Sequence, residues 1–231
     1  KEKNIDTIIT ASTGNAASSL AGICASQNQK AILFVPAAAP KAKLIQIMMY
    51  GGVIVPIDGT YDDAFDITLK VTKEFGWYNR NTAYNPFTVE GKKSVSLELY
   101  EQFNGVLPDK IFVATGDGVI LAGVYKGFED LMNLGIIEAV PTIVCVQAAG
   151  SANLVNNLTT TEFKISPSNT IADSISVDIP RNYFMARDYL LTYGGEFVIV
   201  SDEEIMQSSL ELSKSTGLFA EPAAATAYAG F

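Results

Sequence analysis

The sequence predicts an α/β fold in which parallel strands alternate with helices. Compact, β-branched apolar runs such as Lys30–Pro36 (KAILFVP) and 142–147 (TIVCVQ) are typical of strands buried on both faces of a parallel sheet. Between such runs lie amphipathic stretches of helical length, for example Tyr61–Phe75, at the short spacing of βαβ units. The 231 residues, 48% of them hydrophobic, supply enough material for one large domain or two small ones.

The individual elements follow from the same patterns. In the first part of the chain we expect strands at 6–10, 30–36 and 53–56, helices at 16–25, 40–50 and 61–75, and a short segment at 77–79. Residues 81–91 (NTAYNPFTVEG) are polar, aromatic and interrupted by proline, so we expect a loop. In the second part we expect strands at 110–115, 142–147 and 197–200, and helices at 92–103, 121–134, 182–193, 202–216 and 222–229.

Composition excludes several classes of function. A net charge of -9 without a basic run argues against binding to nucleic acid or to acidic membranes. No apolar run is long enough to cross a bilayer, and the start of the sequence lacks a signal-peptide pattern. Cys24 and Cys145 lie far apart in apolar stretches, as buried thiols of a reducing cytoplasm would. The sequence has no histidine, so we expect no catalytic triad and no metal site. The expected partners are therefore small molecules and other protein chains.

The first candidate site is the turn at residues 11–15 (ASTGN), between a predicted strand and a predicted helix. It presents two hydroxyl groups, a glycine and an amide at a helix N-terminus. Unpaired backbone N–H groups and the positive end of the helix dipole suit a carboxylate, phosphate or phenolate oxygen there. The alternative is an ordinary helix start that Ser12 or Thr13 caps.

The second candidate site is the turn Gly116-Asp117-Gly118, which also follows a strand and precedes a helix. Glycines let the backbone approach an anion closely, and the amides that follow can surround a phosphate. The Asp117 carboxylate would repel that phosphate unless its side chain turned away, and the alternative is a tight turn capped by Asp117. Both turns belong at the carboxyl ends of strands, where open α/β sheets bind ligands.

Six short stretches carry a more specific signal, because they occur in one family's order along nearly the whole chain. Together they resemble the tryptophan synthase-β type (fold type II) pyridoxal phosphate enzymes, and most closely the threonine synthase branch. The stretches are ASTGN at 11–15, VEGKK at 89–93, GDG at 116–118, KGF at 126–128, IADSISV at 171–177 and FAEPA at 219–223.

The resemblance implies two parallel-sheet lobes flanked by helices, at 1–88 and 89–231, with a cofactor cleft between them and an incomplete larger lobe. It implies pyridoxal 5′-phosphate as cofactor, a small amino acid as substrate and a homodimer. The implied substrate contacts are Ser12, Thr13, Gly14 and Thr88. The implied cofactor contacts are Asn15, at the 3′-oxygen of the ring, and the backbone of Gly116, Asp117, Gly118, Val119 and Ile120 at the phosphate.

The family's Schiff-base lysine belongs to a Ser-x-Lys-Asp-like motif that precedes the asparagine turn, and these 231 residues do not contain it. Lys1 and Lys3 stand in the wrong place, and the residue that meets the pyridine nitrogen corresponds to a position after Phe231. We therefore expect a fragment of a longer protein, with no catalytic residue of its own and no turnover as it stands.

The substrate side departs from the family. Several threonine synthases bind the substrate phosphate with an asparagine, a serine and an arginine in the loop where this chain has Thr82, Ala83 and Thr88. Ser176 likewise replaces an arginine, so Arg80 and Arg181 are candidate replacements, the alternative being solvated surface arginines. The favoured reaction is that of threonine synthase, O-phosphohomoserine and water giving threonine and phosphate. The alternatives are a threonine/serine dehydratase, cysteate synthase, the pyridoxal phosphate subunit of 2-amino-4-oxopentanoate thiolase, and a non-catalytic protein that binds a ligand or partner.

Overall fold

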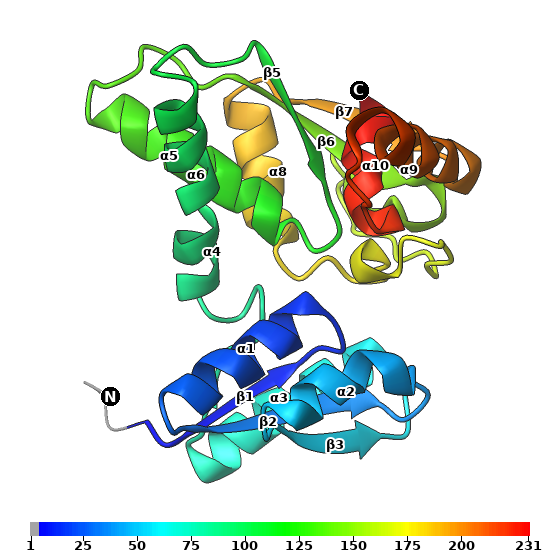
Figure 1. The fold of residues 1–231 in the computed structure, drawn as a ribbon. Coiled ribbons are helices and arrows are strands. Elements are labelled where there is room, and N and C mark those ends of the chain that lie inside the picture. The colour runs from blue at the N-terminus through cyan, green and yellow to red at the C-terminus, as the bar shows by residue number, and fades with distance from the viewer. Residues whose placement is uncertain (1–4) are drawn as a thin grey trace. The chain divides into compact units, whose positions relative to one another are not determined.

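The computed structural model describes residues 5–231, apart from the side chain of Lys43, and it divides the chain into two compact units. The first unit ends at Asn85, and the second runs from Pro86 to Phe231. Figure 1 draws the first unit in blue to cyan and the second in green to red. No helix among the described residues is both long enough and apolar enough to span a membrane.

The first unit is a four-stranded parallel sheet with helices on both faces. Its elements are β1 (Thr7–Ala11), α1 (Asn15–Ser26), β2 (Lys30–Pro36), α2 (Lys41–Met49), β3 (Val53–Ile57), α3 (Tyr61–Phe75) and β4 (Tyr78–Asn79). The predicted strand–helix alternation is confirmed, and the short segment at 77–79 supplies a fourth strand.

In the strand order β3-β2-β1-β4, β2 and β3 follow one another on one side of β1, and β4 is added on its other side. Ile9 of β1 pairs with Ile32 of β2 on one side and with Asn79 of β4 on the other. The helices are divided accordingly: α1 and α2 pack against Leu33 and neighbouring side chains, whereas α3 packs on the opposite face, against Ile9 and Phe34 (Figure 1). The carboxyl ends of β1 and β4 therefore flank a topological switch point, the place where open α/β sheets bind ligands.

The second unit contains a three-stranded parallel sheet of order β5-β6-β7. Its strands are β5 (Lys110–Ala114), β6 (Thr142–Ala148) and β7 (Glu196–Val200). Its helices are α4 (Phe87–Lys92), α5 (Ser94–Gln102), α6 (Val119–Asn133), α7 (Asn153–Asn156), α8 (Tyr183–Thr192), α9 (Asp202–Thr216) and α10 (Pro222–Gly230), with short 3-10 turns at Ala149–Ser151 and Asp173–Ile175.

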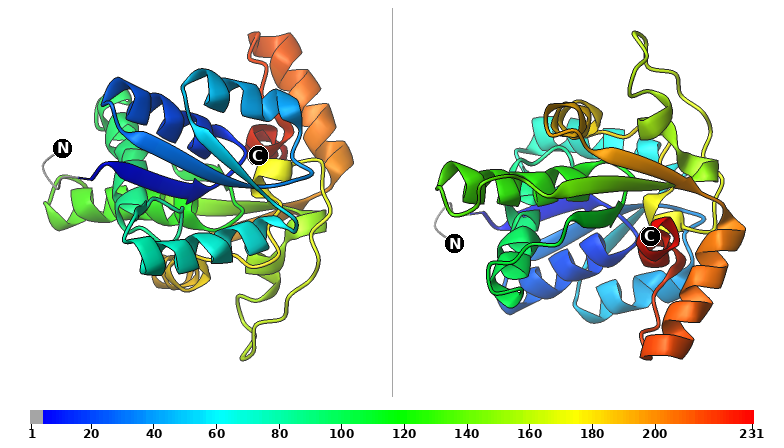
Figure 2. Two further views of the ribbon diagram at one scale, coloured as in Figure 1. Left: turned by 90° about the horizontal axis from the view of Figure 1, so that it is seen from below. Right: turned by 90° about the horizontal axis from the view of Figure 1, so that it is seen from above.

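Side chains of the central strand β6 pack into two separate hydrophobic cores, because successive side chains of a strand point to opposite faces of the sheet. Ile143 and Cys145 point into a cluster with Tyr125 and Phe128 of α6. Val144 and its alternate neighbours point to the other face, where α9 and α10 lie beside one another (Figure 2). Burial raises the pKa of the Cys145 thiol to about 12, which supports its interpretation as a buried, unreactive side chain.

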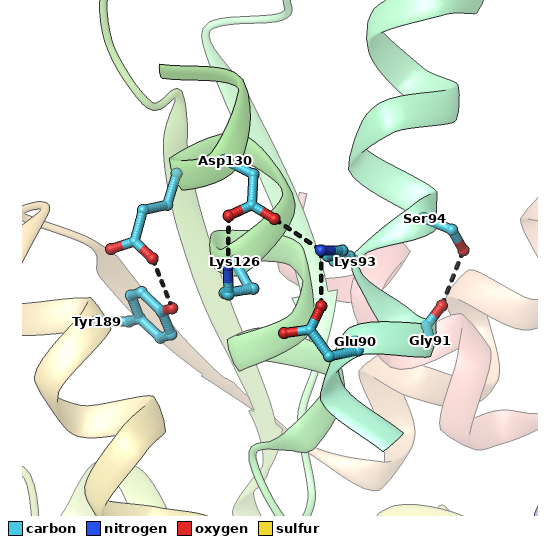
Figure 3. A network of polar contacts seen from close by, with 8 residues as sticks. Glu90, Gly91, Lys93, Ser94, Lys126, Asp130 and Tyr189 are labelled. Atoms are coloured by element: carbon cyan, nitrogen blue, oxygen red, sulfur yellow. Dashed lines mark hydrogen bonds and ion pairs between the residues drawn. The ribbon is translucent and has the colours of Figure 1, made fainter. Parts of the chain in front are cut away.

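Two of the family-like stretches meet where α4 and α5 pack against α6. Lys93 lies between Glu90, at 2.6 Å, and Asp130, at 2.8 Å, and Asp130 also accepts from Lys126 (Figure 3). A Cβ atom on Gly127 would collide with the backbone carbonyl of Lys93, so glycine is required at this close approach. The VEGKK and KGF stretches therefore contribute helix packing.

The prediction of a loop over residues 81–91 is wrong for its second half, because α4 occupies Phe87–Lys92. Proline can interrupt a segment, but Pro86 stands at the N-cap of α4, where its fixed φ starts a helix. The predicted lobes at 1–88 and 89–231 stay a prediction. The chain passes from the first compact unit to the second between Asn85 and Pro86, so Thr88 belongs to the second unit.

Candidate functional site

The turn that follows β1 leads into α1 without a side-chain cap. The N-cap is Gly14, in extended conformation, and the first turn of α1 contains no acidic residue. The Ser12 hydroxyl accepts from the Gly14 amide at 3.3 Å, and neither Ser12 nor Thr13 caps the helix. The ordinary capped start is therefore the wrong alternative. Ser12, Thr13, Gly14 and Asn15 form one continuous turn at the switch point of the first unit.

A buried asparagine from the end of β4 holds this turn. The side-chain oxygen of Asn81 accepts from the Ala11 amide at 2.7 Å and from the Thr10 hydroxyl at 3.1 Å. Its side-chain nitrogen donates to Thr68 of α3 at 2.6 Å, and the residue is 0% exposed. Asn81 thus links the last residue of β1 to α3, and it fixes where the turn begins.

The turn that follows β5 is shaped by two glycines. Gly118 is the N-cap of α6 and has φ +83°, and a Cβ atom there would lie 2.7 Å from the Cβ of Ala186. A Cβ atom on Gly116 would lie 2.9 Å from the Cα of Ile175. Only glycine fits at either position, and α6 starts without a side chain on its N-cap residue.

The segment before α8 holds the Asp117 side chain in place. Its carboxylate accepts from the Arg181 amide at 3.1 Å, and its backbone carbonyl accepts from the Asn182 amide at 3.1 Å. The Asn182 side chain donates to the Gly118 carbonyl at 3.2 Å. The N-cap is Gly118, so the alternative of a helix capped by Asp117 is wrong.

These features fit the phosphate of pyridoxal phosphate. The 15-residue helix α6 has no acidic residue in its first turn, and its N-terminal amides follow a glycine that lets a ligand approach the backbone. Val119 is buried, whereas Ile120 is 49% exposed and leaves an apolar side chain at the surface beside the turn. Gly116, Asp117, Gly118, Val119 and Ile120 therefore form one continuous structure, the β5–α6 turn.

The remaining predicted site residue, Thr88, lies in α4 and is 8% exposed. It belongs to the second unit but to a different element from the β5–α6 turn. Asn81 and Asn182, the two asparagines that hold the turns, were not predicted from the sequence. A single sequence offers only weak signals for them, because each lies more than 60 residues from the turn that it holds.

One known family matches the whole chain. The family described as "Pyridoxal-phosphate dependent enzyme" matches residues 1–231. The chain is 34% identical over 233 residues to threonine synthase of Methanocaldococcus jannaschii, covering 99% of this chain and 57% of that protein. It is 32% identical over 232 residues to threonine synthase of Bacillus sp. (strain ULM1), covering 100% of this chain and 63% of that protein.

Solved structures show the same fold. The structure of maize serine racemase matches with a TM-score of 0.85 at 22% identity, over 99% of this chain and 67% of that one. The processed form of threonine deaminase isoform 2 from Solanum lycopersicum matches with a TM-score of 0.84 at 24% identity, over 100% of this chain and 61% of that one. The chain thus spans about three fifths of the length of the curated relatives named above. With parallel sheets, two glycine-led turns and a family match along its whole length, this chain belongs to the family of pyridoxal-phosphate dependent enzymes.

Proposed function

We propose that this chain supplies the cofactor-phosphate turn and the substrate-carboxylate turn of a lyase that acts on a small amino acid. The finer proposal is the reaction of threonine synthase, in which O-phosphohomoserine and water give threonine and phosphate. The observation that carries the proposal is the β5–α6 turn, where α6 begins at a glycine and Asp117 bonds the Arg181 amide.

In this proposal the backbone amides of the β5–α6 turn bind the cofactor phosphate. The fixed positive φ of Gly118 and the bond from Asn182 to its carbonyl keep those amides in one orientation before any ligand arrives. When bound, pyridoxal phosphate withdraws electrons from the substrate's α-carbon, which is the chemistry that the protein itself cannot supply.

In this proposal the turn after β1 binds the amino-acid substrate. Ser12, Thr13 and Gly14 would bind the substrate carboxylate through hydroxyl and amide donors, and Asn15 would contact the ring 3′-oxygen. Because Asn81 holds the Ala11 amide, the turn keeps its shape without a ligand. Thr88 stays a proposed contact to the substrate.

The names of the curated relatives support the threonine synthase reaction over the alternatives, since several threonine synthases are 29–34% identical to this chain. Thr82, Ala83 and Thr88 replace the family's loop residues, so the experiment is designed to identify the substrate.

The test uses the full-length protein, loaded with pyridoxal phosphate. We expect release of inorganic phosphate from O-phospho-L-homoserine with equimolar threonine, and no ammonia from L-threonine. Ammonia from L-threonine without phosphate release would replace the proposal with a dehydratase. Cofactor binding without either product would favour the non-catalytic alternative. Gly118→Ala should abolish cofactor binding, whereas Gly217→Ala, another glycine with positive φ but no atom within 4 Å of its added Cβ, should not.

A further inference from the structure

Gln147 is a buried glutamine near the carboxyl end of β6, and it bonds the residue that precedes the β5–α6 turn. The residue is 1% exposed. Its side-chain nitrogen donates to the Thr115 carbonyl at 3.1 Å, and its side-chain oxygen accepts from the Val155 amide at 2.9 Å. A carbonyl can only accept and a backbone N–H can only donate, so these two partners determine which way the side-chain amide of Gln147 faces.

The bond to Thr115 acts on the first amide of the β5–α6 turn. The Thr115 carbonyl belongs to the same peptide group as the Gly116 N–H. This group is planar, and the described residues contain no cis peptide bond, so its carbonyl and its N–H point in opposite directions. A donor that fixes the Thr115 carbonyl therefore also fixes the direction of the Gly116 N–H. The bond polarises the peptide group as well, which makes this N–H a stronger donor.

The same arrangement recurs at two later peptide groups of the turn. The Asp117 carbonyl accepts from the Asn182 backbone amide at 3.1 Å, and the Gly118 carbonyl accepts from the Asn182 side chain at 3.2 Å. These carbonyls share their peptide groups with the N–H groups of Gly118 and Val119. Asn182 thus fixes the direction of two amides, and Gln147 fixes that of an earlier one from a different element.

The other end of the Gln147 side chain is held by α7. Val155 lies in the first turn of this short helix, where backbone amides have no partner within the helix. Its neighbour Leu154 is 0% exposed, and the Leu154 Cδ1 would lie 3.1 Å from a Cβ atom on Gly118. Gln147 therefore links the residue before the turn to the helix that packs against Gly118 within it. Because both ends of its side-chain amide are bonded, this link is rigid.

We propose that Gln147 is a positioning residue for the cofactor phosphate: it directs the Gly116 N–H toward the phosphate by holding the carbonyl of the same peptide group. The inference rests on the proposed function and deepens it, because it adds a residue that acts on the phosphate only through the backbone. Without this bond the peptide group between Thr115 and Gly116 could rotate, and a ligand would have to order it on binding, which lowers the affinity.

The test titrates the ¹⁵N-labelled full chain with pyridoxal 5′-phosphate and, separately, with inorganic phosphate, and follows the backbone amides of residues 116–120. Gln147→Met keeps the length of the side chain and removes both hydrogen bonds. It should raise the Kd for both ligands by the same factor, about tenfold, because the peptide group that it frees faces the phosphate. In the ligand-free chain the Gly116 amide should exchange faster with solvent than in the wild type.

The matched control is Ser209→Ala, which removes a buried hydroxyl of α9 from its bond to the Ala220 carbonyl, at 2.9 Å, in the same unit. It should lower the free energy of unfolding, as Gln147→Met does, but change neither Kd by more than about twofold. If Gln147→Met does not fold, Gln147→Asn takes its place. Its side chain is one methylene shorter and does not span both partners, so both Kd values should rise.

Unchanged Kd values in the Gln147 variant, with wild-type shifts at residues 116–120, would overturn the inference and leave the proposed function standing. Equal losses of affinity in Ser209→Ala would also overturn it, because any weakening of the unit would then have the same effect. Binding of pyridoxal 5′-phosphate to the wild type without shifts at residues 116–120 would contradict the proposed function, and with it the inference.

Discussion

Two kinds of helix start occur at the carboxyl ends of strands in this protein. Helices α3 and α9 begin with complete capping boxes, Thr60 with Asp63 and Ser201 with Glu204, and each has acidic residues in its first turn. Helices α1 and α6 begin at glycines and have no acidic residue in the first turn. The first kind satisfies its own amides and opposes an anion, whereas the second kind leaves both amides and dipole available to a ligand.

The two kinds also differ in how their backbone is held. The capped starts depend on bonds between residues three apart. The glycine-led starts depend on residues more than 60 positions away, Asn81 for the turn after β1 and Asn182 for the turn after β5. The glycine-led helix starts therefore have their shape fixed by distant residues. In the proposed function they bind ligands, and a local cap would occupy the groups that a ligand needs.

The largest expected effect concerns Gly118. Gly118→Ala should lower the free energy of unfolding by about 2–4 kcal/mol, since it combines left-handed strain with overpacking against Ala186. Urea denaturation measures the loss. Gly217→Ala, at φ +77° with open space around it, should cost only the strain, about 1–2 kcal/mol. Equal losses in the two variants would show that Ala186 does not confine the β5–α6 turn.

The next effect concerns the support of the turn after β1. Asn81→Ala leaves the buried Ala11 amide and Thr10 hydroxyl without their acceptor and should cost about 2–3 kcal/mol. Amide hydrogen exchange should accelerate at residues 12–15. Asn157→Ala is the control, because Asn157 is a similarly buried asparagine whose side chain donates to the Asn153 and Lys164 carbonyls of the second unit. If both variants accelerated exchange at residues 12–15 equally, Asn81 would have no special role there.

Loss of a local cap should have a smaller and purely structural effect. Thr60→Ala and Ser201→Ala should each cost about 1 kcal/mol, because one first-turn amide loses its acceptor. Neither change should alter the affinity for pyridoxal phosphate, which equilibrium dialysis measures. A cofactor affinity that fell with either cap would contradict the division into closed and ligand-ready starts.

The smallest expected effect is that acid should destabilise the capped helix starts and leave the glycine-led starts unchanged. The backbone and side chain of Thr60 lower the pKa of Asp63, and those of Ser201 lower the pKa of Glu204. A carboxylate with a lowered pKa in the folded state contributes stability above its ordinary value, 3.8 for Asp63 and 4.5 for Glu204, and this stability is lost as pH falls through the lowered pKa. Hydrogen exchange followed as the pH falls below 3.8 should therefore report fraying at the starts of α3 and α9 but not of α1 and α6. Fraying at all four alike would contradict the comparison.

The sequence was sufficient for whatever depends on neighbours along the chain. Apolar periodicity placed the strands, and β2, α3 and α9 were predicted with their observed bounds. The acidic start at Ser201 was recognisable because a capping box lies within four residues. Both glycine-led turns were predicted as anion sites from the same local rules, and that stays a prediction.

The rest depends on tertiary contacts that no spacing encodes. Nothing near Asp117 indicates that its carboxylate accepts from the Arg181 amide, and nothing near Ala11 indicates Asn81. The helix at Phe87–Lys92 was missed because Pro86 can either interrupt a segment or start a helix.

The central claim is that the glycine-led starts of α1 and α6, and not the capped starts, receive the cofactor and its substrate. Addition of pyridoxal 5′-phosphate to the ¹⁵N-labelled chain tests it most directly, with every backbone amide as a reporter. The account predicts shifts of the amides at residues 116–120 and at Asn15, with none at residues 60–63 or 201–204. Shifts at the capped starts, or an unchanged β5–α6 turn in the presence of bound cofactor, would contradict it.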